Sequence, residues 1–513
     1  MLILVALAIR VPRIGAANLW LDEANSWLLA KYSLPALLAN IRASPGSPLY
    51  FVLLKLWVVL FGESESALRS LSLVVSLTLI PVTYALAART VSRRAGFVGA
   101  LLLACAPMQI YYAQEARVYM LVTLLTTCSV LAYVAWRQAV CEPGNPAGDD
   151  PDTSPLPRAL LRSGRAALTA YVVSAILAIY TLDLAALALF ALNVDALLAG
   201  ARMLRAHRRV WPLARNWCLA QIAVGVACLP LALAIDFHTA AHSQDWRRAL
   251  GIPDAIRGLL DFFASTIHGG YLYPWDLYHA FADGWGAGAM LERSLAYPLT
   301  LLAVLAALSY PPRHARTGPV RAVYLVLAIP LLAGVAVSVK HELTLPRYFL
   351  FTTPCLYILI GAGLARMTGW LRATLLVVLL ATMGIGVATY QRVGSRDSDY
   401  RPVARRLAPA LRPGDAILIQ PPEMGVPLSY YLRAHPVAIT GLTAGAPVRG
   451  ALTPAPGPRT WLLLDYRSGT FGGDADSLAK LLPGHVISDV VENPGGSGVR
   501  VIEVDSAAPA HKQ

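Results

Sequence analysis

The chain has 513 residues, of which 56% are hydrophobic and 14% are charged. This composition excludes an ordinary soluble globular protein and predicts a polytopic membrane protein. The net charge of +13 does not indicate a nucleic-acid partner, because the arginines lie in short clusters between apolar runs, as in the cytoplasmic loops of membrane proteins. We therefore expect membrane lipids and phosphate groups as partners, and no nucleic acid.

The first expected span covers residues 1–16. It is short, because a spanning helix takes about 20 apolar residues and a charge already appears at Arg10. Either the native chain begins upstream of Met1 or this first helix is stunted. After it comes Trp20-Leu21-Asp22-Glu23, where two adjacent carboxylates fall at the point at which a membrane helix should end and water begin.

The expected first outer loop, residues 17–65, contains two amphipathic runs, 24–42 and 48–61. The second run could span the membrane or lie in its surface. If it spanned, the basic loop Ser92-Arg93-Arg94 would face outward, against the positive-inside rule. The surface placement is therefore favoured, and it puts the acidic pair on the same outer side as Glu115.

The remaining apolar runs predict ten more spans, which gives about 11 in all, with the N-terminus inside and the C-terminus outside. These runs are residues 66–90, 95–110, 118–136, 168–181, 183–200, 217–236, 294–310, 322–339, 348–365 and 373–390. A second acidic stretch, Gln114-Glu115-Ala116-Arg117, falls outside between the third and fourth spans. Residues 237–292 form a long aromatic outer loop, which suits an interfacial element that covers a cavity.

The C-terminal part, residues 393–513, has the pattern of a small soluble α/β domain on the outer face, attached to a transmembrane domain of residues 1–392. The expected helices are residues 400–411, 428–433 and 475–482. The expected strands are residues 415–419, 437–440, 460–465, 486–491 and 499–504.

Ionisable side chains at a membrane surface are the first candidates for function. Taken alone, Asp22 and Glu23 could equally mark the end of a helix. Glu115 and Arg117 add a second acid beside an arginine on the same side, and together these groups supply a base, a possible metal ligand and a phosphate clamp. That combination suits group transfer from a phosphate-linked donor.

Four other side chains are candidate substrate contacts. Tyr50, Tyr112 and Tyr119 could contact a sugar, or they could belong to the aromatic belt of the membrane surface. His268, in the aromatic loop, could contact sugar or metal, or it could pack at the surface. The sequence has no phosphate-cradling glycine loop and no nucleophile elbow, so we expect no nucleotide cofactor.

Several short motifs follow one another along the chain. They are Leu19-Trp20-Leu21-Asp22-Glu23-Ala24, Pro48-Leu49-Tyr50, Phe61-Gly62-Glu63-Ser64 with Arg69-Ser70-Leu71-Ser72, Gln114-Glu115-Ala116-Arg117-Val118-Tyr119, Arg347-Tyr348 with Pro354, and Asp399-Tyr400-Arg401 with Pro413-Gly414-Asp415. In these motifs the chain resembles the GT-C superfamily glycosyltransferases of the family 39 type, which is similar to protein O-mannosyltransferases and the aminoarabinose transferase that modifies lipid A. The resemblance covers nearly the whole chain and is densest in residues 19–131.

This resemblance implies inverting transfer of a sugar from a polyprenyl-phosphate carrier to an acceptor hydroxyl at the outer face of the cytoplasmic (inner) membrane. Asp22 would be the general base. Glu23 and Glu115 would line an acidic cleft or bind a divalent cation such as Mg²⁺ or Mn²⁺. The phosphate of the donor would be held by Arg117, Arg347 and Tyr348. The acceptor would be an envelope lipid, polysaccharide or protein.

The chain departs from the family where Gly46-Ser47-Pro48-Leu49-Tyr50 replaces the His-Pro-Pro-Leu-Tyr of many relatives, which puts a contact attributed to that histidine in doubt. Asp183 stands in a turn where relatives often carry histidine. Two rival functions stay open. A transporter or flippase of lipid-linked sugars would show paired discontinuous spans and charges near the membrane midplane. A non-catalytic scaffold for envelope assembly would not need the acidic pair.

Overall fold

The computed structural model describes residues 1–43, 48–141, 164–234, 251–268, 318–339, 346–392, 399–435, 437–441, 459–465, 487–492 and 498–505, with a few single positions between 298 and 309. These residues form two compact units. The helical unit contains residues 1–14 and the described residues from 32 to 393. The C-terminal unit joins residues 15–31 to the described residues after 393.

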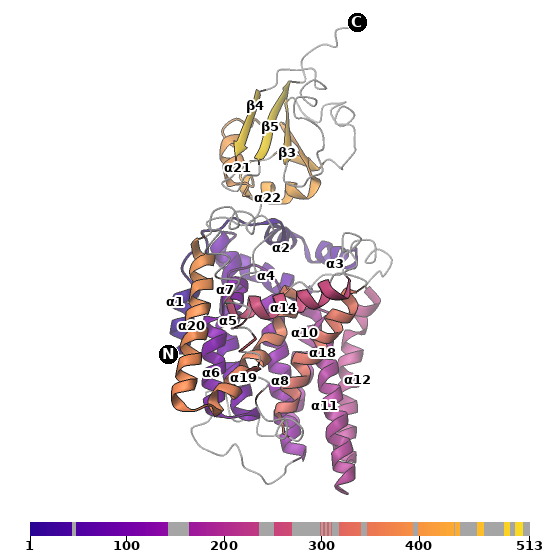
Figure 1. The fold of residues 1–513 in the computed structure, drawn as a ribbon. Helices are drawn as coiled ribbons and strands as arrows, with labels where there is room; N and C mark the ends of the chain where they lie inside the picture. Colours follow the sequence, from indigo (N-terminus) through magenta and orange to yellow (C-terminus); the bar gives the residue numbers. More distant parts are fainter. Residues whose placement is uncertain are drawn as a thin grey trace. The chain divides into compact units, whose positions relative to one another are not determined.

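The helical unit is built from long apolar helices that lie side by side (Figure 1). Its elements are α1 (Leu2–Arg10), α3 (Leu34–Ala43), α4 (Pro48–Phe61), α5 (Glu65–Thr90), α6 (Arg93–Cys105), α7 (Pro107–Ala113), α8 (Tyr119–Cys141), α10 (Gly164–Thr181), α11 (Ala185–Arg205), α12 (Trp211–Ala234), α14 (Ile252–His268), α18 (Val320–Ser338), η1 (Pro346–Thr352), α19 (Thr353–Arg366) and α20 (Gly369–Arg392). In the described part of the chain, 8 helices are long and apolar enough to cross a membrane, or up to 9 if α6 and α7 form one span. The prediction of a polytopic α-helical membrane protein is confirmed.

Several expected spans have different limits. The first helix ends at Arg10, well short of residue 16. The span expected at 95–110 is broken at Pro107, where α6 and α7 meet at a bend of 58°, because proline has no N–H to continue the α-helical ladder. The span expected at 294–310 lies almost wholly outside the described residues.

Two elements belong to the regions expected to be outer loops. The run at 48–61 is the apolar helix α4, with 14 residues, which is shorter than a full span. Within the aromatic loop, α14 lies crosswise to the long helices (Figure 1) and packs against α7, α18, α20 and η1. This contact brings part of the aromatic loop onto the elements that carry Tyr112 and Arg347.

Glycines allow α6 and α19 to approach closely. A Cβ added at Gly361 of α19 would lie 2.6 Å from the Ala95 carbonyl oxygen and 2.9 Å from the Gly99 nitrogen, both on α6. Small residues at such a contact let the backbones of membrane helices come together. Since α6 leads into α7 and η1 leads into α19, this packing also fixes the segments on either side of the candidate site.

An ionic cluster is buried among α8, α11 and α18. The fully buried Asp195 carboxylate accepts hydrogen bonds from Arg137 Nη1 and from the Tyr133 hydroxyl, both at 2.7 Å. Its other oxygen accepts from Arg321 Nε, and Arg321 Nη2 donates to the Asp195 carbonyl oxygen at 2.8 Å. Opposite charges attract strongly where water is excluded, so the cluster ties the three helices together.

The C-terminal unit contains a five-stranded mixed sheet. Its strands are β1 (Ala416–Gln420), β2 (Ala438–Gly441), β3 (Arg459–Asp465), β4 (Ile487–Glu492) and β5 (Gly498–Asp505), in the order β2-β1-β3-β5-β4. β1 pairs in parallel with β2 and β3, whereas β5 pairs antiparallel with β3 and β4. The short helices α21 (Arg401–Leu407) and α22 (Gly425–Tyr431) contribute Val403, Leu407 and Leu428 to a core shared with the sheet.

All five predicted strands are present, each within a residue or two of its expected limits. Asp415, just before β1, is buried and ion-paired to Arg459 Nη2 at 2.7 Å. Burial alone would raise the pKa of Asp415, but hydrogen bonds from the Arg412 amide, Arg459 and Trp461 together lower it below its usual value. The helix predicted at 475–482 lies outside the described residues.

Candidate functional site

The acidic pair lies in the first turn of α2 (Leu21–Lys31), in the C-terminal unit. Carboxylates are stabilised there by the positive end of the helix dipole. Asp22 is half-buried, whereas Glu23 has no exposed surface. Ser26 Oγ donates to the Asp22 carbonyl oxygen at 3.0 Å. The stretch is therefore helical, and Asp22 is the more accessible of the two acids.

Glu115 lies in the turn between α7 and α8, in the helical unit, and is 1% exposed. The Arg117 amide donates to the Glu115 carbonyl oxygen at 2.8 Å, which bends the chain back on itself. The guanidinium carbon of Arg117 lies 6.0 Å from the centroid of the Tyr119 ring, and the Ser72 hydroxyl donates to the Arg117 carbonyl oxygen at 3.4 Å. The structure thus places an acid and a ring-supported cation on one tight turn.

This turn is held by contacts that the sequence did not reveal. Gln114 Nε2 donates to the Arg10 carbonyl oxygen at 2.6 Å and to the Pro12 carbonyl oxygen at 3.1 Å. Gln114 Oε1 accepts from the Tyr390 hydroxyl at 2.8 Å, and Arg10 in turn donates to the Ala104 carbonyl oxygen at 2.7 Å. The residue before Glu115 is therefore fixed from α1 and α20.

Tyr112 is the centre of the candidate site in the helical unit. Its ring packs edge-on against Tyr119, with ring centroids 5.2 Å apart. Glu115 follows Tyr112 by three positions, and η1, which carries Arg347, packs against α8, which begins at Tyr119. The guanidinium carbon of Arg347 lies 5.3 Å from the Tyr348 ring centroid. Segments more than 200 positions apart thus bring acid, cation and aromatic rings together.

Comparisons with known proteins support one fold for this arrangement. A family model of dolichyl-phosphate-mannose-protein mannosyltransferases matches residues 44–140, whereas no curated protein matches the chain. The structure of ArnT from Cupriavidus metallidurans bound to undecaprenyl phosphate is similar over 98% of this chain and 97% of that chain, with a TM-score of 0.60 and 16% identity. The chain has a GT-C fold.

Two further structures with the GT-C fold are of an oligosaccharyltransferase from Archaeoglobus fulgidus. One is a complex with Zn and sulfate, with a TM-score of 0.53 and 12% identity, and covers 97% of this chain and 72% of that chain. The other is tethered to an acceptor peptide, with a TM-score of 0.50 and the same identity and coverage. The resemblance expected from the sequence motifs is confirmed at the level of the fold.

Within the GT-C fold, the predicted site residues fall into two groups. The structure brings Glu115, Arg117 and Arg347 together with Tyr112 and Tyr119. Asp22 and Glu23 belong to the other unit, so a common cleft for all of them stays a prediction. Tyr50 is 1% exposed and packs edge-on against Phe51 in α4. His268 is the last residue of α14, and its side chain lies outside the described part.

The next question is which described residues could hold a divalent cation. Among the residues that the structure describes, no group of three or more His, Cys, Asp or Glu side chains could hold a metal. Asp22 and Glu23 offer two carboxylates on one turn. Mg²⁺ accepts one or two carboxylates when water and substrate phosphate complete its shell. Of this pair only Asp22 is accessible to such a shell, because Glu23 has no exposed surface and consecutive residues on a helix do not face each other.

Proposed function

We propose that the chain is an inverting glycosyltransferase that moves a sugar from a polyprenyl-phosphate carrier to an acceptor hydroxyl at the outer face of the cytoplasmic membrane. The observation that carries this proposal is the match over 98% of the chain to a structure that holds undecaprenyl phosphate. The two cations and aromatic rings around Tyr112 suit the same ligand chemistry, a phosphate attached to an apolar lipid.

In the proposed reaction, the acceptor hydroxyl oxygen attacks the anomeric carbon of the donor sugar from the face opposite the phosphate. A carbon–oxygen bond forms as the bond to the phosphate oxygen breaks, and polyprenyl phosphate leaves with the bonding electron pair. Asp22 takes the hydroxyl proton as general base. The phosphate is stable as an anion, so its departure does not require a general acid.

Arg117 and Arg347 are the proposed anchors of the donor phosphate, with Tyr348 beside them. A guanidinium can donate two parallel hydrogen bonds to phosphate oxygens. An aromatic ring supports each guanidinium and attracts the cation to its face. The Glu115 carboxylate offsets part of the positive charge of the two guanidinium groups. The affinity for the phosphate is therefore lower than it would be with the arginines alone, which allows the product carrier to leave. Glu23 and Glu115 stay the predicted ligands of a divalent cation, which would supply additional positive charge for the phosphate.

Tyr50, Tyr112, Tyr119 and His268 are the candidate contacts for sugar or lipid in this proposal. The acceptor is an envelope lipid, polysaccharide or protein. The C-terminal sheet is one surface that such an acceptor could use, since residues 15–31 and the sheet belong to the same unit.

The test is transfer by the purified protein from a panel of polyprenyl-phosphate sugars to envelope extracts. Asp22→Asn should reduce product formation by about 10²–10⁴-fold, the usual contribution of a general base, while the protein folds normally. Asp254→Asn is the matched control, because Asp254 is also an acid in a first helical turn but is exposed on α14. It should leave the rate unchanged.

Three outcomes would contradict the proposal. Full activity of Asp22→Asn would remove this residue from the role of base. Movement of the lipid-linked sugar between leaflets without a new glycosidic product would favour a flippase. Neither product nor movement with any donor would favour a non-catalytic role.

A further inference from the structure

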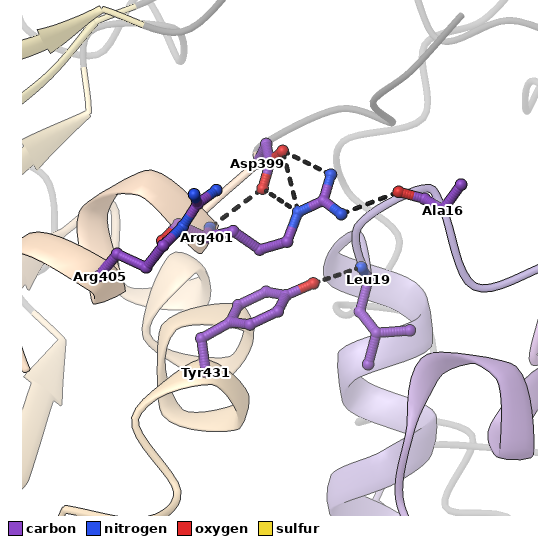
Figure 2. A network of polar contacts seen from close by, with 6 residues as sticks. All are labelled: Ala16, Leu19, Asp399, Arg401, Arg405 and Tyr431. Atoms are coloured by element: carbon purple, nitrogen blue, oxygen red, sulfur yellow. Dashed lines mark hydrogen bonds and ion pairs between the residues drawn. The ribbon is translucent and has the colours of Figure 1, made fainter.

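The helix that carries the acidic pair is tied to the C-terminal sheet domain by hydrogen bonds across the whole length of the chain. The backbone amide of Leu19 donates to the Tyr431 hydroxyl at 2.7 Å, although the two residues are 412 positions apart. Leu19 stands two positions before the start of α2 (Figure 2). The partner of this amide is therefore a side chain of α22.

A second tie fixes the chain just upstream. Arg401 Nη1 donates to the Ala16 carbonyl oxygen at 2.8 Å. Nε and Nη2 of the same guanidinium donate to the carboxylate oxygens of Asp399 at 2.8–3.1 Å, as Figure 2 shows. Because Asp399 contacts Nε and Nη2 and so fixes the plane of the guanidinium, Nη1 is the nitrogen that reaches Ala16. This geometry is specific to arginine.

An apolar contact continues the attachment along α2. The Trp27 ring meets the Tyr430 ring edge-on, with centroids 5.2 Å apart, and both side chains are almost completely buried. Tyr430 neighbours Tyr431 on α22, so the edge-on ring contact with Trp27 and the hydrogen bond to Leu19 come from the same helix. Edge-to-face aromatic pairs stabilise a contact beyond their buried area. Helix α2 is therefore held both at its entry and in its middle.

The attachment point is itself rigid. Leu428 of α22 has no exposed surface and packs in the core with Ile417 and Ile419 of β1. Gly425, at the start of α22, lies so close to the sheet that an added Cβ would be 3.3 Å from Ile439. The contacts of α22 with the sheet thus set the orientation of α2, in addition to the chain on either side of α2.

We propose that Tyr431 and Arg401 are positioning residues that set the orientation of Asp22, so that the C-terminal domain is part of the machinery that aligns the base. This inference rests on the proposed function, since it gives Asp22 the task of removing a proton. A general base must lie within hydrogen-bond reach of the proton it takes, and a displacement of about 1 Å can cost roughly 10²-fold in rate. Contacts at residues 16, 19 and 27 bracket Asp22 on both sides.

The test uses the full chain in lipid nanodiscs with Tyr431→Phe and Arg401→Ala. Tyr431→Phe keeps the ring and removes the hydroxyl that Leu19 uses. Each change should lower kcat about tenfold, the effect of one lost hydrogen bond of about 1–1.5 kcal/mol, with the donor KM within about twofold. Hydrogen exchange of residues 16–31 should accelerate by a similar factor. Arg401→Lys, which keeps one donor, should fall between wild type and Arg401→Ala.

Arg405→Ala is the matched control, because Arg405 is an exposed cation on the same helix and donates to the Arg401 carbonyl oxygen at 3.4 Å. It should change neither rate nor exchange. Wild-type kcat in both test variants would overturn the positioning role, whatever the exchange shows. If the wild-type protein forms no product, the proposed function fails instead, and unchanged exchange of residues 16–31 in Tyr431→Phe would then overturn the attachment as well.

Discussion

Asp195 gives the sharpest test of what holds the helical unit together. Its carboxylate has no exposed surface, and the side chains of Arg137 and Arg321 that pair with it are 6% and 8% exposed. Asp195→Asn keeps the shape of the side chain and removes its charge, which leaves two buried guanidinium groups without their counter-ion. Breaking a buried ion pair in this way costs about 3–5 kcal/mol. We expect the free energy of unfolding to fall by that amount.

Tyr133→Phe provides a graded comparison. It removes only the hydroxyl that donates to Asp195 at 2.7 Å and should cost about 1.5–3 kcal/mol, the range for hydrogen bonds to charged groups. Asp254→Asn, which changes an exposed acid on α14, should cost less than about 1 kcal/mol, the contribution of a charge in a first helical turn. Equilibrium unfolding of the purified protein in one detergent, followed by circular dichroism, measures all three variants.

The triple replacement Asp195→Leu, Arg137→Met and Arg321→Met separates charge pairing from packing. Apolar residues of similar size can replace a buried ionic cluster with little loss, so this variant should be clearly more stable than Asp195→Asn. If Asp195→Asn unfolds like wild type, the cluster does not tie α8, α11 and α18 together. If the triple variant is the least stable of all, the helices depend on the hydrogen bonds of the cluster and not on its charge balance.

Two further changes test helix packing and acid sensitivity. Gly361→Ala should lower the free energy of unfolding by about 1–3 kcal/mol, because the added Cβ would meet backbone atoms of α6. The control Gly384→Ala has open space around the added Cβ and should not lower it. Thermal unfolding measures both variants. Since the pKa of Asp415 is lowered in the fold, its ion pair with Arg459 stabilises the sheet fully above the ordinary aspartate pKa, near pH 4, and loses this effect as the pH falls through the lowered value. Hydrogen exchange of residues 416–420, corrected for its intrinsic pH dependence, should accelerate below about pH 4 in wild type, whereas Asp415→Asn should exchange faster already at pH 7.

The strands of the C-terminal sheet could be predicted because each is a short run rich in β-branched and other apolar residues, with turn residues nearby. Thr460-Trp461-Leu462-Leu463-Leu464-Asp465 is such a run, and β3 differs from it by one residue. The order of the strands could not be predicted, since it depends on pairs far apart in the chain. β1 lies between β2 and β3, and no local pattern distinguishes this order from others.

The helices show where an apolar pattern fails. Residues 95–110 are apolar except for Gln109, so they predict one span, yet Pro107 begins a new helix at a bend of 58°. The pairing of Asp195 with Arg137 and Arg321 was equally hidden, because its three members lie 58 and 126 positions apart. A helix-period pattern identifies the buried face but not which charge on one helix meets which charge on another.

In the candidate site, too, the sequence shows the individual acids but not the distant residues that contact the segments beside them. The acids Asp22 and Glu115 stand out in the sequence because carboxylates are rare beside apolar runs. The residues that orient them do not, since Tyr390 holds Gln114 from α20 and Tyr431 holds Leu19 from α22. In both cases a tyrosine hydroxyl from late in the chain fixes the segment next to an acid. A tyrosine among other aromatic residues carries no mark of this contact, so a search for rare charges finds the candidate acids and misses the residues that hold the segments beside them.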